Sequence, residues 1–134
     1  MKINFRLNKP ADTVYDYLTD MRKFVSVHPV ISKINDLGEN NYKVFETLKF
    51  GFIPVSFTYP VIITSNFRER KVVIKATVMK LTKVEMVFKI TVDNGMTIVD
   101  ESINFETPLP IKSILKSIFT KQHNLLFRNI DQID

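Results

Sequence analysis

The segment PLPIKSILKSIFTKQHNLLFRNIDQID, residues 108–134, decides the fold because it carries the longest helical pattern in the chain. Its apolar residues recur at helical spacing and form one broad stripe, whereas the lysines and the arginine point elsewhere. The stripe consists of Ile111, Ile114, Leu115, Ile118, Leu125, Leu126 and Ile130. Such a stripe must be buried against another element, and the obvious partner is the inner face of a sheet.

Strands are predicted between Val30 and this helix, because apolar and polar residues alternate there with a period of two. The clearest runs are NYKVFETLKFG (41–51), PVSFTYPVIITSNF (54–67), RKVVIKATVMK (70–80), KVEMVFKITVDNG (83–95) and MTIVDESINFETP (96–108). Their connections are short, so runs that are neighbours in sequence should pair in space. The sequence therefore predicts an antiparallel meander.

The N-terminal region is predicted to hold one strand and two short helices. KINFRL (2–7) reads as a strand, and NKPADTVYDYLTD (8–20) begins a helix with Pro10 in its first turn. A second helix, MRKFVSVHP (21–29), should end at Pro29, because proline lacks a backbone donor and biases the preceding residue away from helix. His28 is thus expected at a helix-to-strand corner of an α+β domain.

The composition fits one ordinary globular domain spanning residues 1–134. The chain is 45% apolar and 25% charged, and it has no cysteine, which excludes disulfides and thiolate chemistry. It has no signal-peptide pattern and no apolar run near the ~20 residues that span a bilayer, so a soluble, cytoplasmic protein is expected. The net charge of +5 comes from scattered lysines rather than a cluster, which argues against a nucleic-acid partner.

The order strand, two short helices, six strands and long helix resembles the START-related, polyketide cyclase-like superfamily (SRPBCC, Bet v 1-like). The resemblance is carried by INFRLNKPADTVYDYLTDMRKFVSVHPVI (3–31), which ends in a His-Pro corner, and by ESINFETPLPI (101–111), which enters the long helix. It implies a helix-grip fold, in which a curved seven-stranded antiparallel sheet wraps around the C-terminal helix. In relatives, a cavity between sheet and helix holds lipids, sterols, polyketides or other apolar molecules. The resemblance implies no particular chemistry, since the superfamily includes carriers, cyclases and chaperone-like proteins.

Alternation along the strands predicts which side chains would line such a cavity. Large aromatic residues and methionines suit a pocket that adapts to an apolar ligand. The residues expected to bind the ligand are Glu46, Phe57, Tyr59, Ile74, Met86, Phe88, Glu101, Ile103, Ile118 and Gln122. Gln122 and Asn129 lie two helical turns apart, so their amides could orient a ligand or bind local backbone and water. His123 lies at the margin of the apolar stripe and is expected to be partly exposed.

Glu46 and Glu101 each place a carboxylate on an otherwise apolar face. A buried carboxylate must find partners, take up a proton or face water. The two could act as acid and base on an enolisable, polyketide-like substrate. Alternatively, each pairs with a lysine or tyrosine and has a structural role.

Strict alternation of the connections brings three turns and the His28 corner to one rim of the sheet. The expected mouth of the cavity consists of His28, Phe52, Leu81 and Leu109. An apolar rim of this kind marks an entrance or a contact surface. His28 itself either provides a polar group at this mouth or fixes the turn by bonding local backbone.

Several other chemistries have no motif in the sequence. The three glycines stand alone, so there is no dinucleotide fingerprint or phosphate-cradling loop, and no organic cofactor is expected. Two distant histidines without cysteine give no zinc signature, and there is no G-x-S-x-G elbow. Neither a metal site nor a catalytic residue is predicted.

Three functions remain open. The first is binding or transport of a small hydrophobic molecule, which needs only the apolar lining and a few polar groups. The second is a cyclase or dehydratase type of enzyme, which needs the glutamates or His28 to converge on one point. The third is a protein- or membrane-interaction module of the co-chaperone or quinone-handling type, acting by transient contact through the apolar rim.

Overall fold

The computed structural model describes residues 1–134, apart from the side chain at position 50, and contains the predicted elements in the predicted order. They are β1 (Lys2–Leu7), α1 (Ala11–Thr19), α2 (Met21–Val27), β2 (Ile31–Gly38), β3 (Asn41–Phe50), β4 (Ile53–Asn66), β5 (Lys71–Val78), β6 (Thr82–Asp93), β7 (Met96–Glu106) and α3 (Lys112–Asp131). The expected α+β helix-grip architecture is confirmed. None of the described helices combines the length and apolarity needed to cross a membrane.

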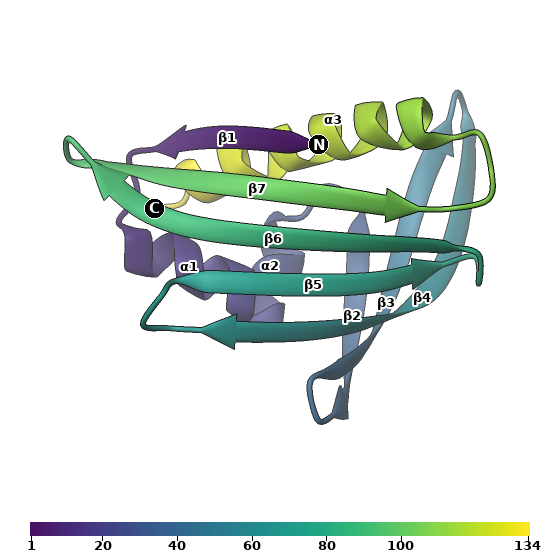
Figure 1. The fold of residues 1–134 in the computed structure, drawn as a ribbon, viewed down its shortest axis with the longest axis horizontal. Helices are drawn as coiled ribbons and strands as arrows, with labels where there is room; N and C mark the ends of the chain where they lie inside the picture. Colours follow the sequence, from purple (N-terminus) through teal and green to yellow (C-terminus); the bar gives the residue numbers. More distant parts are fainter.

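All seven strands form one antiparallel sheet in the order β1-β7-β6-β5-β4-β3-β2. The strands from β2 to β7 follow the predicted meander, and β1 joins its far edge beside β7. Figure 1 shows that the sheet curves strongly at β3 and β4, while all three helices lie on one side of it. The N-terminal ammonium group donates to the Ile103 carbonyl oxygen at 2.9 Å and extends the pairing of β1 with β7.

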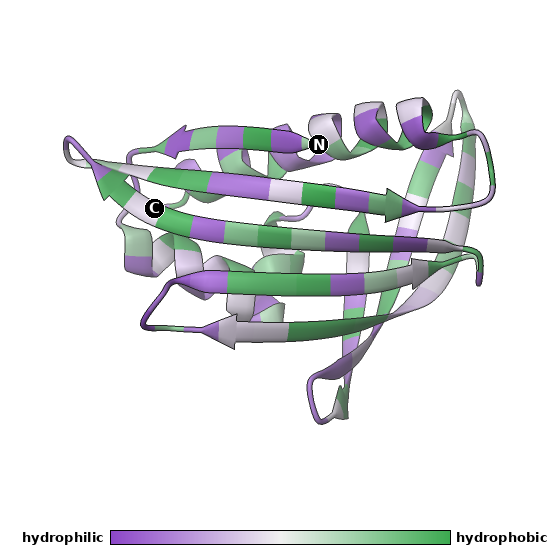
Figure 2. Ribbon diagram, in the orientation of Figure 1, coloured by the Kyte–Doolittle hydropathy of each residue, from purple (hydrophilic) through white to green (hydrophobic). Residues whose placement is uncertain are grey.

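The alternating hydropathy of the strands produces this one-sided arrangement. Along β6, Val84, Met86, Phe88 and Ile90 are buried, and the residues between them are partly or fully exposed. Figure 2 shows purple positions between green ones along β6, whereas β5 has an unbroken green stretch near its start. Because side chains of successive strand residues point to opposite faces, the apolar set faces the helices and the polar set faces solvent.

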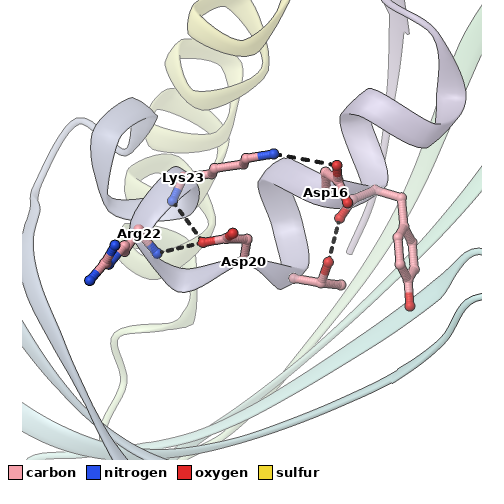
Figure 3. Close-up of polar contacts among 6 residues, drawn as sticks. Asp16, Asp20, Arg22 and Lys23 are labelled. Carbon is pink, nitrogen blue, oxygen red and sulfur yellow. Dashed lines mark hydrogen bonds and ion pairs between the residues drawn. The ribbon is translucent and has the colours of Figure 1, made fainter.

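The junction between α1 and α2 is fixed by a carboxylate cap. Asp20 lies between the two helices, and its Oδ1 accepts hydrogen bonds from the backbone N–H groups of Arg22 and Lys23 at 3.0 and 3.3 Å (Figure 3). These are donors that the first turn of a helix leaves without partners. Asp16 and Lys23 also form an ion pair across the junction, at 3.4 Å. The cap sets the direction of α2, whose end carries His28 towards the sheet.

Only the C-terminal half of α3 is buried, on a stripe that differs from the expected one. The buried residues are Gln122, His123, Leu126, Phe127 and Ile130. The expectation that the stripe begins at Ile111 is wrong in the first half, where Ile114 is 58% exposed. The C-terminal half is held by the Phe5–Phe127 ring contact, with centroids 4.4 Å apart, and by a 2.8 Å hydrogen bond from Asn129 Nδ2 to the Val27 carbonyl oxygen.

Candidate functional site

A small cavity lies between the inner face of the sheet, α2 and α3. Its volume is about 40 Å³, which is room for one or two water molecules. Its wall is formed by Phe24, His28, Ile31, Ile34, Val44, Glu46, Tyr59, Val61, Ile63, Ile74, Ala76, Met86, Phe88, Phe119, Gln122 and His123. Most of this wall is apolar, and the five side chains with strong polar groups come from the corner after α2, the strongly curved strands β3 and β4, and α3.

Glu46 and Tyr59 lie on the paired strands β3 and β4 and form one polar unit in this wall. The Tyr59 hydroxyl donates to Glu46 Oε1 at 2.8 Å. Burial raises the pKa of Glu46, although the hydrogen bond from Tyr59 and the nearby His123 oppose that shift. Burial and the adjacent Glu46 carboxylate raise the pKa of Tyr59 well above its ordinary value, so the phenol keeps its proton. The tyrosine partner agrees with the structural alternative that the sequence left open for Glu46.

His28 lines the cavity and also fixes the corner between α2 and β2. Its Nδ1 accepts hydrogen bonds from the backbone N–H groups of Val30 and Ile31, at 3.2 and 3.1 Å. Burial, with a smaller contribution from His123, lowers the pKa of His28 to about 3. The ring is therefore neutral at physiological pH, and because Nδ1 is an acceptor, the proton is on Nε2.

His123 and Glu101 form a buried pair between α3 and β7. Nδ1 of His123 lies 2.7 Å from Oε1 and 2.6 Å from Oε2 of Glu101. The hydrogen bond joins Nδ1 to Oε1, and Oε2 has no hydrogen-bond partner in the described part of the chain although it is as close to Nδ1. The expectation that His123 is partly exposed is wrong, because its side chain is only 4% exposed. The helix turns this ring inward, where it packs against Phe88 and Phe119.

The two amides predicted on α3 have different surroundings. Asn129 is occupied by the Val27 carbonyl oxygen at the end of α2 and thus ties the helices together. Gln122 lines the cavity, is 7% exposed, and has no side-chain hydrogen bond to the described part of the protein. Of the two amides, Gln122 is therefore the one that lines the cavity with its hydrogen-bonding groups unused.

The structure brings together six of the ten residues predicted to bind a ligand. Those on the cavity wall are Glu46, Tyr59, Ile74, Met86, Phe88 and Gln122. Phe57, Ile103 and Ile118 are not on the wall, and Glu101 lies behind it as the partner of His123. Phe24 and Phe119 are on the wall but were missed. Phe119 is adjacent in sequence to Ile118, so the helical phase could have been set one residue later.

The residues predicted at the mouth separate into two groups. Phe52, Leu81 and Leu109 are exposed in three connections at the same end of the sheet, and none of them lines the cavity (Figure 1). His28 is partly buried and lines the cavity, so the structure separates it from the other three residues of the predicted mouth. Its bonds to Val30 and Ile31 pull the ring inward at the corner.

The rim combines exposed apolar side chains with basic ones. The apolar members are Phe52, Ile53, Met79, Leu81, Leu109 and Ile114. Exposed lysines lie close to them in the sequence, namely Lys49, Lys80, Lys83, Lys112 and Lys116. Among the described residues, no group of three or more histidine, aspartate or glutamate side chains has an arrangement that could hold a metal ion.

Solved structures share this fold at low sequence identity. Ara h 8.0201 matches with a TM-score of 0.79 and 14% identity over 98% of this chain and 93% of that one. A START superfamily protein from Mycobacterium smegmatis matches with a TM-score of 0.79 and 13% identity over 98% and 93% of the two chains. The di-domain ARO/CYC StfQ of the steffimycin biosynthetic pathway matches with a TM-score of 0.75 and 12% identity over 98% of this chain and 48% of that one. The fold is thus the START-like, Bet v 1-like helix grip.

Comparison of the sequence with protein families identifies a family within this fold. No curated protein matches the chain. The family model for CoxG, described as the G subunit of carbon monoxide dehydrogenase, matches residues 4–132, which is nearly the whole sequence. The match includes every strand from β2 to β7 and the buried half of α3. The chain therefore belongs to the CoxG family.

Proposed function

We propose that the protein binds a small hydrophobic molecule between the inner face of the sheet and α3. The observation that carries the proposal is the cavity wall, which is mostly apolar but includes side chains with unused hydrogen-bonding capacity. Apolar walls with a few placed polar groups are typical of sites for small molecules. The structural neighbours that carry START or ARO/CYC in their names support the same interpretation in general terms.

Uptake of such a molecule requires the cavity to expand. A volume of about 40 Å³ is smaller than any lipid, sterol or polyketide. The first half of α3 is the element that can move, because Ile114 is exposed there while the second half of the helix is anchored through Phe127 and Asn129. We infer that this half-helix and Phe119 move outward when the ligand enters.

Binding is favoured over cyclase or dehydratase chemistry by the separation of the two carboxylates. Glu46 is bonded to Tyr59 and Glu101 to His123, and no hydrogen bond joins the two glutamates. A general acid and a general base must both reach the reacting atoms. Glu101 lies behind His123 and is almost fully buried, so it does not line the cavity from which a substrate would be reached.

The binding proposal is tested by native mass spectrometry of the purified protein, followed by organic extraction of any co-purifying molecule. The variant Ala76→Leu adds volume at the cavity wall and should reduce the fraction of ligand-loaded protein. Ala11→Leu is the matched control, because Ala11 is buried to a similar extent but lies on α1 outside the cavity wall. Equal loading of both variants and the wild type would contradict the proposal.

A second role is supported by the rim. Exposed apolar side chains on turns at one end of the sheet, with exposed lysines close to them in the sequence, suit transient contact with an anionic membrane surface. Co-sedimentation with vesicles of anionic phosphatidylglycerol, compared with zwitterionic phosphatidylcholine vesicles, tests this role directly. Binding to neither type of vesicle would contradict it.

A further inference from the structure

Three polar groups of the cavity wall have no partner among the described residues. They are Nε2 of His28, Nε2 of His123 and the side-chain amide of Gln122, and no hydrogen bond to the protein involves any of them. The only fully enclosed side-chain nitrogen or oxygen without a partner in the described part of the chain is Glu101 Oε2. The other three groups therefore keep some accessible surface, and their side chains line the cavity.

His28 presents a hydrogen-bond donor. Its Nδ1 accepts from two backbone N–H groups, which require a lone pair at that nitrogen. A neutral imidazole with a lone pair on Nδ1 carries its proton on Nε2. The corner between α2 and β2 thus fixes the tautomer, and Nε2–H is left for a ligand.

His123 has only Nε2 free for a ligand, because its Nδ1 faces Glu101. Nε2 is a donor in the two arrangements that place a proton between Nδ1 and the carboxyl group. If the pair is ionic, the imidazolium carries a proton on each nitrogen. If the proton lies on the Glu101 carboxyl group, Nδ1 accepts a hydrogen bond from that group, and the one proton of the neutral ring is on Nε2. Both of these arrangements give an Nε2–H group.

Gln122 adds a third donor beside His123 on the buried face of α3. It is almost fully buried and its side chain lacks a protein partner, which is costly unless water or a ligand bonds to the amide. The remaining polar unit of the wall is Glu46 with Tyr59, in which Oε1 of Glu46 accepts from the tyrosine hydroxyl. Three side chains of the wall therefore offer N–H donors, beside the acceptor oxygens of Glu46 and Gln122.

We propose that the cavity selects apolar molecules that carry a carbonyl oxygen, and that His28, His123 and Gln122 donate hydrogen bonds to this oxygen or to two such oxygens. The inference rests on the proposed function, since it names the chemistry of the ligand's polar end. A neutral carbonyl fits better than a carboxylate, because Glu46 and Glu101 already bring two acidic groups to this region. It also fits better than an alkane, which would leave three donors buried without partners.

The test uses 2-octanone labelled with ¹³C at the carbonyl, together with octane, 2-octanol and octanoate as probes of matched length. On binding, the carbonyl ¹³C resonance of 2-octanone should move downfield from its position in hexane, as a hydrogen-bonded carbonyl does. Gln122→Leu, which keeps size but removes the donor, should weaken binding of 2-octanone by roughly three- to tenfold and leave octane binding unchanged or stronger. Gln122→Met serves as the second variant if the leucine variant does not fold.

Asn124→Leu, on the exposed face of the same helix, is the control and should change neither affinity. A carbonyl resonance that matches free ketone in hexane, or equal loss of octane and 2-octanone in the Gln122 variants, would overturn the inference while leaving hydrophobic binding intact. Tighter binding of octanoate or 2-octanol than of 2-octanone would also overturn it. Failure of all four probes to bind would contradict the proposed function itself.

Discussion

Nδ1 of His123 on α3 lies 2.6 Å from Oε2 of Glu101 on β7, and both side chains are almost completely shielded from solvent. This pair links the long helix to the sheet at a position that the contact of Phe127 with Phe88 also supports. Removal of one partner from a buried pair leaves the other group in a low-dielectric interior without compensation. The pair is therefore expected to specify how α3 docks.

Substitution His123→Phe should lower the free energy of unfolding by roughly 3–5 kcal/mol at neutral pH, because Glu101 loses its one hydrogen-bond partner. Chemical denaturation measures this loss. The double variant Glu101→Met, His123→Phe should recover most of it, since neither polar group is then left in the interior.

The exposed pair of Lys75 and Glu85, 3.9 Å apart, is the control for these single and double variants. Neutralising Lys75 should cost less than about 1 kcal/mol, because solvent screens a surface pair. If His123→Phe lowers the free energy of unfolding by as little as the Lys75 variant does, the buried pair does not specify how α3 docks on the sheet.

The sequence was sufficient to predict the topology, but the rotation of α3 was only partly predictable. Alternating residues with short connections allow one meander, and this pattern is repeated in five consecutive runs. The helix has apolar residues over more than half of its circumference, so its pattern is compatible with several rotations. The choice among them depends on tertiary contacts, here Phe5 with Phe127 and Glu101 with His123, which periodicity does not contain.

His28 should remain neutral throughout the ordinary pH range, because burial lowers its pKa to about 3. In two-dimensional ¹H–¹⁵N NMR spectra, its ring nitrogens should show the Nε2–H tautomer from pH 8 down to about pH 4. The unfolded chain binds a proton near pH 6.5 while the folded protein does not, so this residue reduces stability as the pH falls from 6.5 towards 3. A His28 resonance that titrates near pH 6.5 would contradict the corner geometry.

Glu46→Gln should become more stable relative to the wild type as the pH rises from about 4 to 7. Burial raises the pKa of Glu46, so the unfolded chain releases this proton before the folded protein does, and the wild type loses stability over that range. Glutamine carries no charge and its oxygen can still accept from Tyr59. The measurement is the difference in denaturation midpoint at a series of pH values across this range. If the stability of Glu46→Gln relative to the wild type decreases as the pH rises, the prediction is contradicted.

The structural alternative from the sequence assigned each glutamate a lysine or tyrosine partner, which is right for Glu46 but wrong for Glu101, whose partner is His123. Tyr59 reaches Glu46 through the antiparallel register of β3 and β4, which alternation makes foreseeable. His123 reaches Glu101 from an element that is not hydrogen-bonded to β7 through its backbone. Such a contact depends on the height and rotation of a helix over a sheet, and no short-range pattern encodes either quantity.

Phe88→Asp should destabilise the protein by several kcal/mol, because it places an unpaired carboxylate beside the Glu101–His123 pair and removes the contacts of Phe88 with His123 and Phe127. Thermal unfolding monitored by circular dichroism measures the loss. Val92→Asp is the control on the same face of β6, since Val92 is exposed near the strand end, and it should change stability by less than about 0.5 kcal/mol. Similar effects of the two variants would mean that the inner face has been assigned wrongly.

The substitution Phe52→Ser tests the role of the rim without disturbing the packing of the core. Phe52 is fully exposed in the turn between β3 and β4, so its loss should leave the melting temperature within about 1 °C of the wild type. If the rim contacts anionic membranes, the variant should bind phosphatidylglycerol vesicles several-fold more weakly, because an apolar anchor is lost while the lysines of the rim remain. Phe67→Ser is the control, since Phe67 is also exposed but lies in the turn between β4 and β5 at the opposite end of the sheet. Equal vesicle binding by both variants would show that Phe52 is not part of the contact surface. A large loss of stability in Phe52→Ser would mean that this side chain packs inside the protein.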